Sequence, residues 1–285
     1  AKTDNIGSGR ISLENTLLNG VSVNTPGNLF MTADRLTSGE NVDLVGKNIY
    51  LVTDDFVLNN GPLELISAPN GEVVISKLTS GIIKMDNTGR IDSNPTITHL
   101  DTTSINLIQG KKLIIGNHAV TNNNTQDIEI SAPIIRTGIS GDLELNASNS
   151  INVLASNEIS NAVGDLTLVA SQVSLEANAV AKGENLIVAT DKLNVDPTAK
   201  LTVNIVDGNE GNGGNVRITR KTAGDVIISP TDNPTAPELY LTQAKLDTVV
   251  ADSLNIGSYS NISDSKVNNL KVLAPVTVDE TLILQ

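Results

Sequence analysis

Short apolar doublets recur along the whole chain. In each doublet, two apolar residues flank one residue that is mostly polar or charged, as in Ile128-Glu129-Ile130 and Val173-Ser174-Leu175. Alternate side chains of a strand point to the same face, so this pattern predicts strands with one buried and one solvated face. The doublets recur about every 10 residues, and the segments between them are rich in Asn, Gly, Asp, Ser and Pro, which favour turns. The chain is therefore predicted to be all-β.

A longer repeat predicts how these strands are arranged. Residues 141–148 read GDLELNAS, residues 164–171 read GDLTLVAS, and a looser copy at 183–190 reads GENLIVAT, so the spacings are 23 and 19 residues. A repeat of this length that carries strands is typical of a solenoid built from β-coils. We expect a right-handed parallel β-helix of about 14 coils, because parallel crossovers are overwhelmingly right-handed. At ~4.8 Å per coil the rod would be roughly 65–70 Å long.

The register of the repeat makes a prediction for single residues. Leu145 and Leu168 both occupy the fifth position of the repeat, so we expect them to stack inside the solenoid, with Thr167 pointing to solvent. The register of residues 184–190 stays open, because an ungapped 19-residue offset would exchange inward and outward positions.

An antiparallel sandwich or barrel is the alternative, because it also has short strands at regular intervals. Tight hairpin signals are few, with Asn19-Gly20 and Asn70-Gly71 the clear cases, and this favours the solenoid. The pattern weakens near 87–103, 206–215 and 229–237, where Pro or Gly interrupts it. Doublets resume after each break, so we interpret the breaks as irregular excursions from one domain that spans residues 1–285.

Composition narrows the function classes. The net charge is −13 and basic residues are spread out, which disfavours binding to nucleic acid or to anionic lipid. The chain has no cysteine, no visible signal peptide and no apolar run long enough to span a membrane, so we expect no membrane insertion. Only 2% of the residues are aromatic, which disfavours an aromatic-lined carbohydrate cleft or a single-strand nucleic-acid site.

Three segments resemble repeats of the large bacterial exoproteins of the filamentous-haemagglutinin type. They are LYLTQAKLDTVVADSLNIGS at 239–258, GNGGNVRIT at 211–219 and the Gly-Asp-Leu-x-Leu-x-Ala-Ser repeat itself. The resemblance covers residues 140–285, and the first half joins it only through periodicity. It implies a right-handed parallel β-helix that is exported by two-partner secretion through an outer-membrane partner. It also implies display on a Gram-negative-type bacterial surface, or secretion from it.

One departure from the family pattern concerns its N-terminal secretion domain, which carries Asn-Pro-rich signatures. Asn94-Pro95 is the nearest match here, and its context differs. The chain also opens and closes within strand patterns, at Ile11 and at residues 282–284. We therefore expect an internal fragment of a longer rod.

Few residues are candidates for chemistry. His99 and His118 have no cysteine or carboxylate cluster at metal-ligand spacing, so we interpret both as solvated turn residues. Asp54-Asp55 and Asp225 could form a carboxylate pair of the kind that glycosidases use, but no basic cluster accompanies them, which favours solvated turn acids. No Gly-x-Ser-x-Gly motif for a nucleophilic serine is present.

Two further motifs are weak. The run Asp207–Asn215 is similar to a calcium loop but has no closing carboxylate, so a turn is the favoured interpretation. Glycosylation sequons at Asn123, Asn146 and Asn261 are expected by chance in a chain rich in Asn, Ser and Thr. We predict no catalytic, cofactor-binding or metal-binding residue.

The sequence favours a non-enzymatic, structural β-helical shaft of a secreted or surface-displayed bacterial adhesin. The expected partners are a host or neighbouring-cell surface protein or glycan, together with the outer-membrane secretion partner of the parent protein. Two alternatives stay open. One is the stick of a contact-dependent growth-inhibition toxin, and the other is a polysaccharide lyase or hydrolase on the same scaffold.

Overall fold

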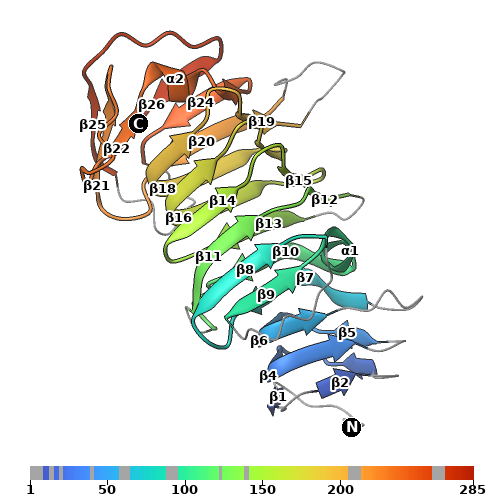
Figure 1. The fold of residues 1–285 in the computed structure, drawn as a ribbon. Helices are drawn as coiled ribbons and strands as arrows, with labels where there is room; N and C mark the ends of the chain where they lie inside the picture. The colour runs from blue at the N-terminus through green and yellow to red at the C-terminus, as the bar shows by residue number, and fades with distance from the viewer. Residues whose placement is uncertain are drawn as a thin grey trace.

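A computed structural model describes most of the chain. The described residues are 9–12, 16–18, 22–38, 42–57, 65–87, 96–121, 124–137, 141–204, 213–258 and 267–285. Within them the protein is all-β, apart from two short helices, α1 (Thr102–Asn106) and α2 (Gln243–Leu246). Figure 1 shows the strands stacked as successive layers between the two ends of the chain.

Every strand pair in the described part of the chain is parallel, and the longest ladder passes through eleven strands. In order, these strands are β1 (Gly9–Ser12), β4 (Leu29–Ser38), β6 (Ile49–Val57), β7 (Leu65–Ser76), β10 (Ile108–Gly116), β13 (Asp142–Asn146), β16 (Leu166–Leu175), β18 (Leu186–Val195), β20 (Asn215–Thr219), β24 (Ser253–Ile256) and β26 (Thr281–Leu284). Each strand pairs with its equivalent one layer further on, as a solenoid requires. The parallel sheets are consistent with a β-helix, and the antiparallel alternative does not fit them.

The other strands flank this ladder. The large sheet also contains β2 (Thr16–Leu18), β3 (Ser22–Asn24), β5 (Asp43–Val45), β8 (Gly81–Met85), β9 (Ile97–Leu100), β11 (Thr125–Ile130) and β14 (Ser150–Val153). A second sheet consists of β12 (Ile134–Arg136), β15 (Glu158–Asn161), β17 (Val180–Gly183), β19 (Lys200–Val203) and β23 (Val249–Val250). A third consists of β22 (Leu239–Leu241), β21 (Gly224–Ile228) and β25 (Val267–Val272).

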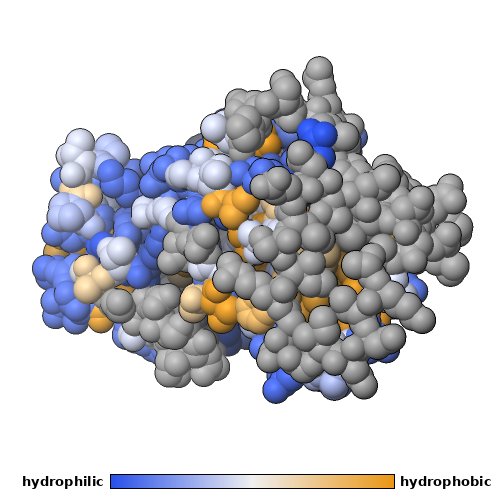
Figure 2. Space-filling view, turned by 90° about the horizontal axis from the view of Figure 1, so that it is seen from below, coloured by the Kyte–Doolittle hydropathy of each residue, from blue (hydrophilic) through white to orange (hydrophobic). Residues whose placement is uncertain are grey.

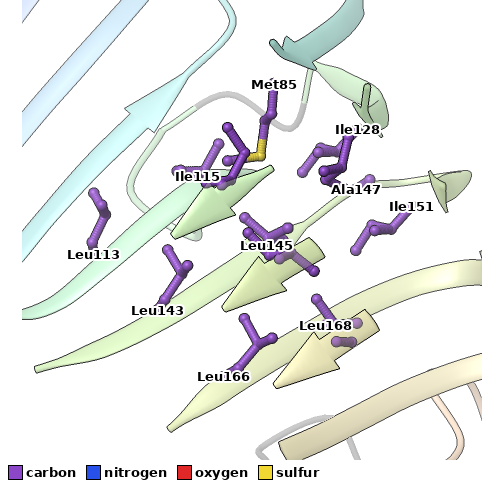
Figure 3. Packing of buried hydrophobic residues seen from close by; sticks show 14 of the residues in the cluster. Met85, Leu113, Ile115, Ile128, Leu143, Leu145, Ala147, Ile151, Leu166 and Leu168 are labelled. Atoms are coloured by element: carbon purple, nitrogen blue, oxygen red, sulfur yellow. The ribbon is translucent and has the colours of Figure 1, made fainter. Parts of the chain in front are cut away.

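The apolar doublets form the core, as the alternation predicts. Leu145 pairs with Leu168, and both side chains are fully buried, which confirms the predicted inward register. Thr167, which precedes Leu168 on β16, is only half-buried. Figure 3 shows two parallel columns of such side chains, with Leu113, Leu143 and Leu166 in one and Ile115, Leu145 and Leu168 in the other. In Figure 2, hydrophobic side chains are visible near the middle of the view, and the described surface on the left is mostly hydrophilic.

The third copy of the repeat is in a different register from its best sequence match. Leu186 pairs with Leu166, so the structural offset is 20 residues. The alignment of Gly183 with Gly164 is therefore wrong by one residue. Gly164 and Gly141 have φ values of +125° and +120°, a conformation that favours glycine. A Cβ on Gly164 would lie 2.5 Å from the carbonyl oxygen of Gly141, so close approach between coils also requires glycine there.

The order of strands along the stack reverses locally at two places. Strand β9 follows β8 in the sequence, yet β9 contacts the earlier strand β6, and β8 pairs with both β9 and β11. In the same way β22 contacts β18, while β21 pairs with β22 and β25. A short helix follows each reversal, α1 after β9 and α2 after β22. Between β21 and β22, residues 229–238 form no strand, and part of the region near 87–103 belongs to β9 and α1.

Candidate functional site

Both histidines are integrated into the fold. His99 lies on β9 with 10% of its side chain exposed, and its Nδ1 is 2.8 Å from a carboxylate oxygen of Asp86. The His118 ring packs against Tyr50 with a centroid distance of 5.7 Å, and its Nε2 lies 3.3 Å from Glu72. The interpretation as a solvated turn residue is therefore wrong for His99. His118 does lie at a turn, where the Thr121 amide donates to its carbonyl at 3.1 Å, but only 18% of its side chain is exposed. The two rings pair with different acids, so they do not form a common site.

The predicted solvated acids are ion-paired strand residues. Asp54 lies on β6 with 7% of its side chain exposed, and Asp55 beside it accepts a 2.7 Å hydrogen bond from Arg35. Asp225 lies on β21 and accepts a 2.5 Å hydrogen bond from Lys271, which lowers the pKa of Asp225 below its ordinary value. The structure does not bring Asp54 and Asp225 together as a pair, because one belongs to β6 and the other to β21. The interpretation of these acids as solvated turn residues is wrong.

The weaker motifs have no role that the structure reveals. Most of the calcium-like run lies outside the described residues, and the Gly213 amide beside it donates a 2.6 Å hydrogen bond to Asp252. Asn123 and Asn261 also lie outside the described residues, and Asn146 donates to Glu144.

Among the described residues, no group of three or more His, Cys, Asp or Glu side chains could hold a metal ion. No helix in that part is long and apolar enough to cross a membrane.

A buried ion pair lies at the first reversal of strand order. The Lys77 ammonium is fully buried and lies 3.1 Å from Asp54 of the preceding coil. Thr79 donates to the same carboxylate twice, from its backbone amide at 2.9 Å and from its hydroxyl at 2.8 Å. Lys77 also donates to Thr98 of β9 at 3.0 Å. Burial lowers the pKa of Lys77, and the negative charge of Asp54 opposes this effect.

The second reversal contains the same arrangement. Arg220 is 4% exposed and lies 3.0 Å from Asp191 of β18, and Thr222 donates to Asp191 from both its amide and its hydroxyl at 2.9 Å. Arg220 also donates to the carbonyl of Pro237 at 2.6 Å, next to β22. We call the carboxylate, the cation and the threonine together a latch. The first latch joins the turn before β8 to Asp54 on β6 of the preceding coil. The second joins the turn before β21 to Asp191 on β18 in the same way.

Sequence reasoning missed the latches, although a signal for them exists. Residues 77–81 read KLTSG and residues 220–224 read RKTAG, so a cation and a threonine two residues later precede glycine in both. Each run has a Thr-Asp partner upstream, at residues 53–54 and 190–191. The signal is an internal repeat with a period far longer than one coil, and it does not lie in the apolar pattern.

An open groove of about 720 Å³ lies beside the second latch. It follows one corner of the stack, where chain segments of successive coils lie side by side: Ser150 pairs with Gln172, and Gln172 pairs with Lys192. Its lining residues are Asn149, Ser150, Ser171, Gln172, Asp191, Lys192, Arg220, Thr222, Ala223, Gly224, Asp225, Pro237, Glu238 and Asn268. Apart from Ala223, Gly224 and Pro237, these residues are polar or charged. The groove can therefore form several hydrogen bonds to a ligand.

The charges along the groove largely compensate each other. Asp191 pairs with Arg220, and Asp225 pairs with Lys271. Lys192 and Glu238 remain, with opposite charges and with no ion pair to another described residue. The groove is thus close to neutral on the surface of a protein with a net charge of −13.

No family model, no curated protein and no solved structure matches this chain.

Proposed function

We propose that the chain is a structural shaft segment of a secreted or surface-displayed bacterial adhesin and that it catalyses no reaction. The continuous parallel ladder of eleven strands carries this proposal. A ladder of this kind resists extension and bending, because each coil is bonded to its neighbours along the full strand. Such a shaft holds a binding surface away from the cell. The resemblance of residues 140–285 to filamentous-haemagglutinin-type exoproteins supports the same assignment.

The detailed architecture we propose is a right-handed β-helix. Its hand rests on the strong preference of parallel crossovers for the right-handed sense. The length of the chain divided by a 20-residue repeat predicts about 14 coils, but several layers of the ladder are more than 20 residues apart, as Ile75 and Ile115 are. We therefore propose eleven coils, one for each strand of the ladder, with a stack about 48 Å long at ~4.8 Å per layer.

The proposal that the chain catalyses no reaction rests on the contacts that its acidic side chains make. Asp54, Asp191 and Asp225 each form an ion pair with a neighbouring cation. A general acid for glycoside cleavage needs a carboxyl group whose pKa is raised, and the pKa of Asp225 is instead lowered by Lys271 and Asn269. These acids are suited to holding coils together.

Force spectroscopy on the purified chain, held between two handles at its ends, tests the shaft. Because the strand ladder joins each coil only to its immediate neighbours, we expect extension in several small steps. A single all-or-none rupture would contradict the proposal. A second assay tests the adhesin part: beads coated with the chain should bind to a panel of host and bacterial cells better than albumin-coated beads. Equal binding, or cleavage of polysaccharides that Asp225→Asn abolishes, would count against it.

A further inference from the structure

The groove at the corner of the stack is elongated along the solenoid axis. Its lining begins at Asn149 on one coil and continues through Gln172 and Lys192 on the next two. It then crosses Glu238 before β22 and ends at Asn268 on β25. Strands β22, β21 and β25 are neighbours in one sheet, and β22 contacts β18. The groove therefore spans six layers, which is about 24 Å at ~4.8 Å per layer.

The backbone beneath the groove is already hydrogen-bonded. The Gln172 amide donates to the carbonyl of Asn149 at 2.8 Å, and Gln172 and Lys192 pair in the parallel ladder. An extended peptide that binds by strand addition needs free backbone groups at a sheet edge, and the part of the corner at Asn149, Gln172 and Lys192 does not offer them. Recognition in the groove therefore depends on side chains.

Four of these side chains have no hydrogen bond or ion pair to any described residue: Asn149, Lys192, Glu238 and Asn268. Two are amides, which donate and accept at once, and the other two add one cationic donor and one anionic acceptor. Hydroxyl groups of a ligand also donate and accept at once, so they match this set. The groove offers a strongly anionic polymer no excess of positive charge, because Asp191, Asp225 and Glu238 offset Arg220 and Lys192. A lipid tail would have to cover the polar and charged residues that make up most of the lining.

We propose that this groove binds a neutral oligosaccharide, with the sugar chain parallel to the solenoid axis. The proposal rests on the proposed adhesin function and names the surface of the shaft that contacts a glycan. The second latch fixes the wall of the groove, because Arg220 joins Asp191 on one side to the Pro237 carbonyl on the other. Ala223 is exposed in the lining, so a large side chain there would occupy the space of the ligand.

Isothermal titration and an array of immobilised sugars test the proposal with the whole chain. The probes are tetrasaccharides built from glucose, galactose, mannose or N-acetylglucosamine, with a sulfated heparin tetrasaccharide as the anionic comparison. We expect at least one neutral probe to bind. Ala223→Trp should weaken that binding by about tenfold or more, whereas Ala155→Trp, at an exposed alanine outside the groove, should change it by less than about twofold.

A second pair of variants tests the groove even if the Ala223→Trp variant does not fold. Asn149→Ala removes an exposed groove amide and should weaken binding, whereas Asn194→Ala removes an exposed amide outside the lining and should not. The groove proposal is overturned if no neutral probe binds at millimolar concentration, if the sulfated probe binds more tightly, or if groove and control variants behave alike. Any of these results together with stepwise extension under force would contradict the groove proposal and leave the shaft proposal supported. A single rupture under force would instead contradict the shaft proposal.

Discussion

Asparagine in place of Leu168 and asparagine in place of the neighbouring Thr167 should lower the free energy of unfolding by very different amounts. Leu168 is fully buried between Leu145 and Val188 of the adjacent coils, whereas Thr167 is half-buried and lies between Glu144 and Ile187. Leu168→Asn loses about 1.5–3 kcal/mol of apolar burial, and an unpaired buried amide adds about 1–3 kcal/mol. The total of about 2.5–6 kcal/mol is a large share of a typical stability of about 5–15 kcal/mol. Thr167→Asn should cost less than about 1 kcal/mol.

Urea unfolding followed by circular dichroism measures both costs, and limited proteolysis locates the damage. Because the strand ladder joins each coil only to its immediate neighbours, cleavage of the Leu168→Asn variant is expected first within residues 140–190. Equal destabilisation by the two substitutions, or a larger loss for Thr167→Asn, would refute the assigned inner and outer faces. Cleavage spread evenly along the chain would refute the local nature of the contacts.

Two further predictions concern buried polar groups. Asp54→Asn should destabilise the protein by about 3–5 kcal/mol, because it leaves the Lys77 ammonium buried without its counter-charge. In urea unfolding, the double variant Asp54→Asn/Lys77→Met should recover much of that loss. A double variant that is no more stable than Asp54→Asn would contradict this prediction. Burial and a 2.9 Å hydrogen bond to Glu72 raise the pKa of Tyr50 to about 12, so ultraviolet titration should show one phenol that ionises late, and Glu72→Gln should bring it closer to 10. The unfolded phenol ionises more readily, so this group should reduce stability as the pH rises above 10, and a Tyr50→Phe variant should lack that part of the loss.

The apolar pattern predicts the core well because strand side chains alternate between faces. The pair Val173 and Leu175 is buried while Ser174 between them is only half-buried. The rule fails at Tyr50, which is 3% exposed although it lies between two inward residues. Tyr50 stacks on Phe30 at 4.6 Å in a second apolar cluster outside the main core. Local alternation does not reveal such a cluster, because its members come from the outer positions of several coils.

The latches and the reversals of strand order could not be predicted from local pattern. Lys77 and Arg220 lie in polar segments between strands, where a cation is normally expected in solvent. Their burial depends on Asp54 and Asp191, which come from preceding coils and meet them only after the coils stack. The groove has the same origin, because its lining comes from segments between residues 149 and 268. Contacts between coils therefore determine the candidate site, and doublets within a coil determine the core.

Disulfide trapping tests the central claim, which is that successive coils stack in parallel and in register. The chain has no cysteine, so Asn152→Cys/Ser174→Cys introduces the only pair, at outward positions that face each other on β14 and β16. Neighbouring parallel strands are about 4.8 Å apart, which lies within the Cα separation that a disulfide accepts. Gln172 is displaced by two residues, or roughly 6.6 Å along the strand, so Asn152→Cys/Gln172→Cys should not close. We expect rapid and nearly complete bridging of the 152–174 pair under mild oxidation, and little of the 152–172 pair; the reverse order, or no difference, would contradict the stacked parallel register.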